Sequence, residues 1–329
     1  MTKAAPPALS VVDHAERPAR NVLAPMMVVV AIAGLLLLGW ITTPEFLTFR
    51  NLQSIVRASA LIGIIAVSMT FITITGSFFS LSVAQTAAAA AISFAALLSW
   101  SWPVWAAILT VLIGGAVIGL AQGGAVALGG NPIVVTLAVG ATLFGAGAWL
   151  TDNKTVRTGT DAAHWIGTAR PFGIPTQTWA FLFIAVIAAV VLTRSRFGRE
   201  ATLVGANRLA GVGAGLRPGR VALTVFAISS LGAVIAGIFA AAQFEQGRLD
   251  QFDGVDIDAI AAILVGGAAI QGGEASALRS ALGAVFIAAL QNLMVLRGLG
   301  FGVRLFLVGL AILVSVSTFT ILRHRRQLT

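Results

Sequence analysis

The chain has 329 residues, of which 58% are hydrophobic and only 10% are charged, and it contains no cysteine. Because about a quarter of the residues in a soluble globular domain are charged, this composition excludes that class. The absence of cysteine excludes disulfides, zinc–thiolate sites and thiol catalysis.

Apolar runs recur along the whole chain, and each is long enough to cross a hydrocarbon core of about 30 Å as a helix. A transmembrane β-barrel would instead show short segments of alternating polarity. We therefore expect an all-α polytopic membrane protein. It should have about ten transmembrane helices, near residues 22–41, 58–75, 78–99, 104–127, 132–150, 177–193, 220–242, 255–270, 281–296 and 301–321. The predicted organisation is a disordered N-terminal tail over 1–21, a single transmembrane domain over 22–322 and a basic tail over 323–329.

The net charge of +9 is placed on one side of the predicted membrane. With the N-terminus inside, the inner segments hold thirteen basic and four acidic residues, whereas the outer segments hold eight of each sign. This bias is the one that orients membrane proteins, and it predicts that both termini are cytoplasmic. Basic residues facing anionic membrane lipid account for the charge, so we expect no nucleic-acid partner.

Small residues and two loops stand out along the chain. Gly119 and Gly123 lie four residues apart, a spacing that permits close helix contact. The outer segment Thr151–Thr176 is either a contact for an external partner or a plain solvated loop. The inner loop Arg194–Arg220 is basic, and its leucines and valines are spaced to give a short helix an apolar face. This loop either docks on a protein partner or lies on the lipid surface.

The stretch Val255–Asn292 combines an acidic entrance with glycine pairs inside an apolar run. Asp256 and Asp258 open it, and the pairs Gly266-Gly267 and Gly272-Gly273 interrupt it. Glycine costs about 1 kcal/mol relative to alanine inside a helix. Membrane helices tolerate glycines where helices pack closely or where the chain reverses inside a protein bundle. The stretch therefore predicts part of a pathway and not only an anchor.

Several kinds of chemistry are missing from the chain. Neither of its two lysines, Lys3 and Lys154, completes the Gly-Lys-Ser/Thr phosphate cradle of nucleotide hydrolases. The three histidines lie in tails or loops, so we expect no metal site within the membrane. Carboxylates are nearly absent from span interiors, which weighs against an ion-coupled carrier. A helical pathway without these devices is either passive or driven by a motor that would attach at the basic inner loop.

Several motifs along the chain follow one another in a fixed order and spacing. The clearest are Asp258–Ala262, Gly266-Gly267, Gly272-Gly273, Gly283-Ala284 and Asn292. Others are Asn131–Leu137, Leu81–Val83, Phe197–Arg199, Gly205, Asn207-Arg208 and Gly215. In these motifs the sequence resembles the permease subunit of bacterial ABC importers of the ribose and simple-sugar type, and the resemblance covers nearly the whole chain beyond residue 40. The chain departs from the family pattern at Ser80, Ala84, Leu209, Glu274 and Arg279. Such departures fit one half of a heterodimeric permease, or a subfamily with its own ATPase.

The resemblance implies a multi-pass protein of the bacterial inner membrane that is not itself an enzyme. Its partners would be cytoplasmic ATP-binding subunits, a second permease copy or paralogous permease, and a periplasmic solute-binding protein. ATP and Mg²⁺ would be bound by the ATPase, and this chain would bind no cofactor. Residues 194–220 would be the docking loop, shaped by Gly205, Asn207, Arg208 and Gly215. Four hinge glycines would let neighbouring helices move past each other, namely Gly266, Gly267, Gly272 and Gly273.

The solute is poorly marked by the sequence, although the family implies a monosaccharide or related sugar. Gln85, Gln122, Gln291 and Asn292 either line the pathway or form hydrogen bonds between packed helices. Two other functions remain open at this point. One is an ion-coupled secondary carrier or facilitator that acts without an ATPase, and the other is a structural membrane scaffold.

Overall fold

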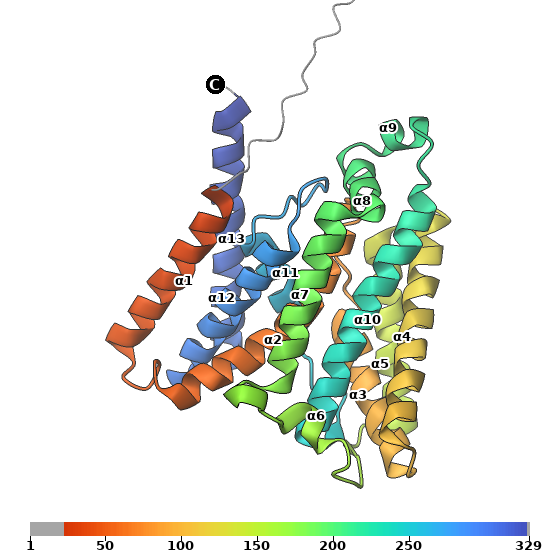
Figure 1. The fold of residues 1–329 in the computed structure, drawn as a ribbon, viewed down its shortest axis with the longest axis vertical. Coiled ribbons are helices and arrows are strands. Elements are labelled where there is room, and N and C mark those ends of the chain that lie inside the picture. The colour runs from red at the N-terminus through yellow and green to blue at the C-terminus, as the bar shows by residue number, and fades with distance from the viewer. Residues whose placement is uncertain (1–22, 328–329) are drawn as a thin grey trace, which may run out of the picture.

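The computed structural model describes residues 23–327 as a bundle of helices with one pair of two-residue strands (Figure 1). The predicted tail over 1–21 lies outside the described residues. The elements in chain order are α1 (Leu23–Thr42), α2 (Phe49–Ile74), α3 (Val83–Ser99), α4 (Val104–Ala127), α5 (Pro132–Thr151), β1 (Val156–Arg157), α6 (His164–Thr168), a 3-10 turn (Pro171–Gly173), α7 (Thr176–Arg194), α8 (Arg196–Ala206), α9 (Arg208–Gly213), α10 (Pro218–Phe244), β2 (Gln246–Gly247), α11 (Val255–Val265), α12 (Ala277–Leu296) and α13 (Phe301–Gln327).

Every predicted span overlaps a helix, and the all-α membrane class is confirmed. Within the described residues, seven helices are long and apolar enough to cross a membrane: α2, α4, α5, α7, α10, α12 and α13. The helices α1 and α3 contribute shorter apolar stretches, at Met26–Thr42 and Val83–Ser99. The helix α13 continues to Gln327, past the predicted boundary at residue 322.

Two boundaries differ from the prediction for local physical reasons. The predicted span over 255–270 ends at Val265, because Gly266 terminates α11 and Gly267 takes a positive φ of 77°. At 11 residues, α11 reaches only about half-way across a hydrocarbon core. The second span, predicted to begin at residue 58, begins at Phe49, because the Thr48 side chain caps the first turn of α2.

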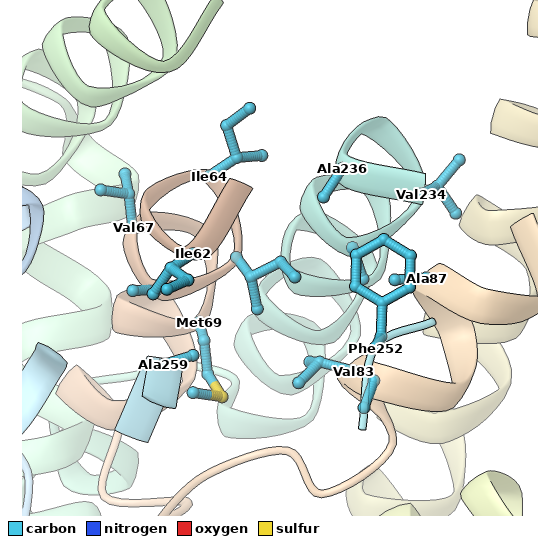
Figure 2. Close-up of a cluster of buried hydrophobic side chains, with 14 of the residues drawn as sticks. Ile62, Ile64, Val67, Met69, Val83, Ala87, Val234, Ala236, Phe252 and Ala259 are labelled. Atoms are coloured by element: carbon cyan, nitrogen blue, oxygen red, sulfur yellow. The ribbon is translucent and has the colours of Figure 1, made fainter. Parts of the chain in front are cut away.

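The core lies where α2, α3, α10 and α11 converge. Figure 2 shows Ile64 and Met69 of α2 on one side, with Val83 of α3 and Val234 of α10 on the other. Long stretches of α2 and α10 are buried, whereas α4, α5 and α13 expose most of their surface to the surroundings. Helices that are apolar all round and sit on the outside suit a lipid environment.

Close approach of α4 to α10 depends on small residues. A methyl group at Gly119 would lie 2.7 Å from the Ala227 Cα, and one at Gly123 would lie 2.6 Å from the Leu223 Cα. The predicted role of this glycine pair in close helix contact is confirmed. Dispersion contacts between backbones replace the side-chain packing that larger residues would provide.

The bundle has two distinct ends. The helices α8 and α9 and the end of α13 lie at one end, and α6 lies at the other (Figure 1). At the α6 end, β1 pairs antiparallel with β2, with Val156 opposite Gly247 and Arg157 opposite Gln246. We call the α8–α9 end the inner end and the α6 end the outer end, following the sides predicted from charge.

Candidate coupling site and polar helix contacts

The predicted docking loop folds as two short helices that share one capping residue. The side chain of Ser195 accepts a hydrogen bond from the Gly198 amide at 3.0 Å and starts α8. Asn207 lies between the helices, and its side chain accepts from the Ala210 amide at 3.0 Å, which caps α9. Aspartate, asparagine and serine suit this position because their side chains satisfy amides that have no partner in the first turn. The single short helix expected here is therefore a pair, broken at Asn207.

One face of this pair is buried and the other is unusually apolar for an exposed surface. Ala201 and Val204 are buried against the bundle, and the Phe197 ring stacks on Phe71 of α2 with centroids 6.3 Å apart. The opposite face exposes apolar side chains beside the arginine of the family motif; these residues are Leu203, Arg208, Leu209 and Val212. Leu209 is 85% exposed. The apolar residues of the docking loop therefore lie on two faces, one buried against the bundle and one exposed. The exposed apolar face is suited to a docking partner.

Gly205 brings the docking loop into backbone contact with two other segments. A methyl group at Gly205 would collide with the Ile74 carbonyl oxygen at the end of α2, and it would lie 2.8 Å from the Gly273 amide nitrogen. The same Gly273 amide donates a hydrogen bond to the Ile74 carbonyl oxygen at 2.8 Å. Three segments far apart in the sequence therefore meet without an intervening side chain.

Gly76 and Gly272 complete this contact. A methyl group at Gly272 would lie 2.5 Å from the Gly76 Cα and 3.1 Å from the Gly205 carbonyl oxygen. One at Gly76 would lie 2.9 Å from the Gln271 carbonyl oxygen. We call the four residues Gly76, Gly205, Gly272 and Gly273 the glycine junction. Gly76 was missed in the sequence; its signal is a glycine directly after a buried apolar span, at the side where the docking loop was expected.

The predicted hinge residue Gly266, together with Gly283 of the family match, allows α11 to pack closely against α12. A methyl group at Gly266 would lie 2.7 Å from the Arg279 backbone, and one at Gly283 would collide with the Ala262 carbonyl oxygen. The link between the helices is folded back on itself, since the Ala269 amide donates to the Glu274 carbonyl oxygen at 2.7 Å. Thr70 of α2 donates to the Ser280 hydroxyl at 2.9 Å, which attaches the first turn of α12 to α2. Gly215, the last residue of the predicted loop set, takes a positive φ of 80° before α10 and has open space around it.

Two of the predicted pathway polar residues lie around the link between α2 and α3. The Ser82 hydroxyl donates to Gln122 Oε1 at 3.1 Å, and Gln122 is buried. The Leu81 amide donates to Thr136 Oγ1 of α5 at 3.2 Å. Gln85 is half-buried, and its Oε1 has no hydrogen-bond partner within residues 23–327. Ser80, a departure from the family pattern, is buried against the Ser82 hydroxyl at 3.1 Å.

The other two lie toward the outer end of α12. Gln291 donates to Asp258 Oδ1 of α11 at 2.7 Å. Asn292 and Asn51 exchange two side-chain hydrogen bonds of 2.8 and 2.9 Å between α12 and α2. Gln122, Gln291 and Asn292 thus make contacts of the packing kind, one of the two alternatives left open by the sequence. A role of these residues in the pathway stays a prediction.

The outer loop predicted over Thr151–Thr176 is structured by contacts with the α10–α11 segment. The Thr158 amide donates to the Glu245 carbonyl oxygen at 3.0 Å, next to the β1–β2 pair. The His164 Nδ1 lies 2.8 Å from Glu245 Oε1. A polar hollow of about 520 Å³ opens between the two segments, lined by Arg157, Asp161 and Glu245 among others. Within the described part of the chain, no group of three or more His, Cys, Asp or Glu side chains is placed to hold a metal ion.

Comparison with known proteins identifies the family. The family model described as the permease component of the branched-chain amino acid transport system matches residues 51–316. The chain belongs to this permease family. The match includes α2 through most of α13, and therefore both the glycine junction and the docking loop.

Individual relatives of the permease are similar over almost their whole length. The ribose import permease protein RbsC of Escherichia coli K12 is 29% identical over 87% of this chain and 91% of its own length. The probable ABC transporter permease protein YphD of the same strain is 30% identical, over 90% and 89%. The L-arabinose transport system permease protein AraH is 28% identical over 84% of each chain. No solved structure matches the permease.

Family membership and the apolar helices together establish a multi-pass protein of the inner membrane. The permease subunits of ABC importers work with ATPase and binding-protein partners in general. The chain is therefore a transport subunit that forms the translocation pathway of such an importer.

Proposed function

We propose that this chain forms the translocation pathway of an ATP-driven importer whose solute is a monosaccharide or related sugar. The names of the relatives carry the solute class, since RbsC is a ribose permease and AraH an L-arabinose permease. The observation that carries the coupling mechanism is the glycine junction, where the predicted docking loop meets the pathway helices backbone to backbone.

The docking loop would transmit the motion of the ATPase to the pathway helices. An ATPase subunit would bind the exposed surface formed by Arg208, Leu209 and their neighbours. A shift of α8 would then press on the end of α2 and on the α11–α12 link, because no side chain separates them from Gly205. Close-packed contacts of this kind move as rigid bodies and do not deform gradually.

The proposed orientation has both termini in the cytoplasm and about ten crossings. Successive helices from α1 to α5, then α7 and α10, would alternate in direction and make seven crossings. The short α11 with its folded link would complete the eighth crossing, and α12 and α13 would make the ninth and tenth. The inner end carries the basic docking loop and the end of α13, which is the side favoured by the positive-inside bias.

The partners would divide the remaining tasks. ATP and Mg²⁺ would be bound by two cytoplasmic ATPase subunits, and this chain would bind neither. A second permease, either a copy or a paralogue, would supply the other half of the pathway. A periplasmic binding protein would deliver the solute to the outer end, where the polar hollow beside β1 and β2 offers charged groups of both signs.

Affinity purification of the tagged chain from its own organism in mild detergent tests this function. An ATPase subunit should co-purify, identified by mass spectrometry. Arg208→Glu should reduce the recovered ATPase, because Arg208 lies on the exposed surface of the docking loop. Arg157→Glu, at the outer end, is the matched control and should leave recovery unchanged. Purification of a transport-competent chain without any ATPase would contradict the proposal.

One observation favours a second candidate, an ion-coupled carrier. Asp258 is a buried carboxylate in a membrane segment, and such groups often bind a coupling ion. This candidate predicts uptake that follows an ion gradient and needs no ATP.

A further inference from the structure

A polar pocket opens at the outer end between α11, α12 and α13, away from the glycine junction. It has a volume of about 290 Å³, near the lower end of the range for small-molecule sites. Its walls carry charged, amide and aromatic groups, namely Asp253, Asp258, Gln291, Phe301 and Arg304. The other exposed side chains of α13 up to residue 318 are mainly apolar, so these polar groups are gathered at one place.

The pocket contains charged groups of opposite sign that do not form an ion pair with each other in the described chain. Asp258 and Arg304 both line it. Asp258 accepts one hydrogen bond, from Gln291 at 2.7 Å. The Arg304 Nε is buried and has no hydrogen-bond partner among residues 23–327. The Arg304 side chain as a whole is half-exposed and lines the pocket, so its guanidinium is available to a ligand.

The mixture of groups selects the chemistry of the ligand. A simple cation would meet the Arg304 guanidinium, and a simple anion would meet the carboxylates of Asp253 and Asp258. A hydroxyl group can donate to a carboxylate and also accept from a guanidinium, so a molecule with several hydroxyls can bridge the two. The Phe301 ring is 57% exposed and adds an apolar face beside Arg304, whose guanidinium carbon lies 5.9 Å from the ring centroid.

We propose that the pocket between Asp258 and Arg304 is a binding site for a monosaccharide-sized polyol at the outer end of the chain. The inference rests on the proposed function for its solute class. The site holds the sugar weakly by hydroxyl bridges between Asp258, Gln291 and Arg304, with the Phe301 ring against the carbon skeleton. Weak binding suits a transport protein, since a solute that binds tightly does not leave.

The absence of cysteine from the chain provides a direct test. Leu305→Cys places a single thiol at the pocket wall, where Leu305 is partly exposed. The labelling rate with a membrane-impermeant maleimide is measured on the importer assembled in nanodiscs. D-ribose, L-arabinose and D-galactose serve as probes, and triethylene glycol dimethyl ether, which has neither charge nor hydroxyl group, controls for osmotic effects. At a concentration about twice its Kd, a bound sugar should slow labelling about threefold.

Variants in the same background separate the pocket from other effects. Arg304→Gln and Asp258→Asn should each abolish the protection, whereas Arg248→Gln and Asp152→Asn, which change exposed charges elsewhere at the outer end, should leave it intact. Ala162→Cys, on an exposed outer loop, should show no protection by sugar. If the Leu305→Cys chain does not assemble, the sugar-dependent rise in melting temperature of the cysteine-free chain, and its loss in Arg304→Gln, is measured instead.

Three outcomes overturn the proposal: no protection by any of the three sugars, protection that persists in both pocket variants, or equal protection by sodium chloride. Any of these, together with intact ATP-dependent sugar uptake, would refute the pocket and leave the proposed function standing. Absence of sugar uptake by the complete native importer would instead refute the proposed function.

Discussion

The two ends of the molecule are built in opposite ways. At the inner end, Gly76, Gly205, Gly272 and Gly273 bring three segments into backbone contact and leave no space for a methyl group. At the outer end, charged and amide side chains of α11, α12 and α13 surround an open pocket of about 290 Å³. The same stretch, Val255–Asn292, contributes to both ends.

This difference separates coupling from solute contact. A junction without side chains transmits displacement, because any shift of one backbone meets another at once. A pocket lined by polar side chains can exchange its hydrogen bonds with a passing solute or with water. The comparison predicts that substitutions in the glycine junction lower both stability and ATP-driven uptake. Substitutions at the outer end should lower stability by a smaller amount.

The largest effect is expected from Gly205→Ala at the junction. The new methyl group collides with the Ile74 backbone, which cannot move aside as a side chain could. We expect a destabilisation of about 3 kcal/mol, at the upper end for overpacked sites, and a loss of ATP-driven uptake. Thermal unfolding in detergent and transport assays measure the two effects.

Gly213→Ala is the matched control for that substitution. Gly213 is exposed at the end of α9 and has open space around its Cα, so alanine should be neutral or slightly stabilising. Equal stability of the Gly205→Ala and Gly213→Ala chains would show that the junction is not closely packed.

A smaller effect is expected from Asn292→Ala, which breaks the paired hydrogen bonds with Asn51 at the outer side of α12. One buried amide loses its partner, so unfolding should become easier by about 1 kcal/mol. The double variant Asn51→Ala/Asn292→Ala should be less destabilised than the sum of the single variants. Strict additivity in this double-mutant cycle would contradict the pairing.

A similar effect is expected from Asn207→Ala, which removes the cap of α9 at the inner end. The loss of one capping hydrogen bond should cost about 1 kcal/mol, confined to the docking loop. Hydrogen exchange should increase in residues 208–213 and remain unchanged in α10. Asn207→Asp keeps the capping acceptor and should retain the native protection; if it exchanges as fast as Asn207→Ala, the cap is not what orders α9.

The smallest effect is expected from Asp253→Asn, and it should depend on pH. Burial raises the pKa of the Asp253 carboxyl, and the neighbouring Asp250 and Asp256 raise it further. The folded chain therefore binds this proton more tightly than the unfolded chain, so ionisation of Asp253 lowers stability as the pH rises through its unfolded and then its raised folded pKa. The stabilisation of Asp253→Asn relative to the native chain should grow over that range and level off above it. A constant difference between melting temperatures from pH 3 to pH 7 would contradict this.

The sequence predicted the helical class, the family and the position of most helices, because long apolar runs and several ordered motifs each carry that information locally. It also placed Gly205 and Gly272-Gly273 in separate functional groups without indicating that they touch. Their contact depends on how α8, α2 and the α11–α12 link pack, and no local pattern encodes a meeting of residues more than sixty positions apart.

The outer pocket was missed for the same reason. The sequence marks Asp258 as part of an acidic entrance to its span, but no local pattern links it with Arg304. Their common pocket follows from the early end of α11 at Val265 and from the packing of α13 against α11. A helix that continued to residue 270, as predicted, would not leave this pocket, because the pocket depends on the end of α11 at the first glycine pair.

Uptake into proteoliposomes tests the central claim most directly. The purified chain is reconstituted with its co-purifying ATPase and a second permease, and radiolabelled D-ribose and L-arabinose are offered with the cognate binding protein. The account predicts uptake of a monosaccharide that requires ATP, the ATPase and the binding protein, and that is insensitive to ionophores. Uptake by this chain alone, without ATP and abolished by collapsing an ion gradient, would contradict it.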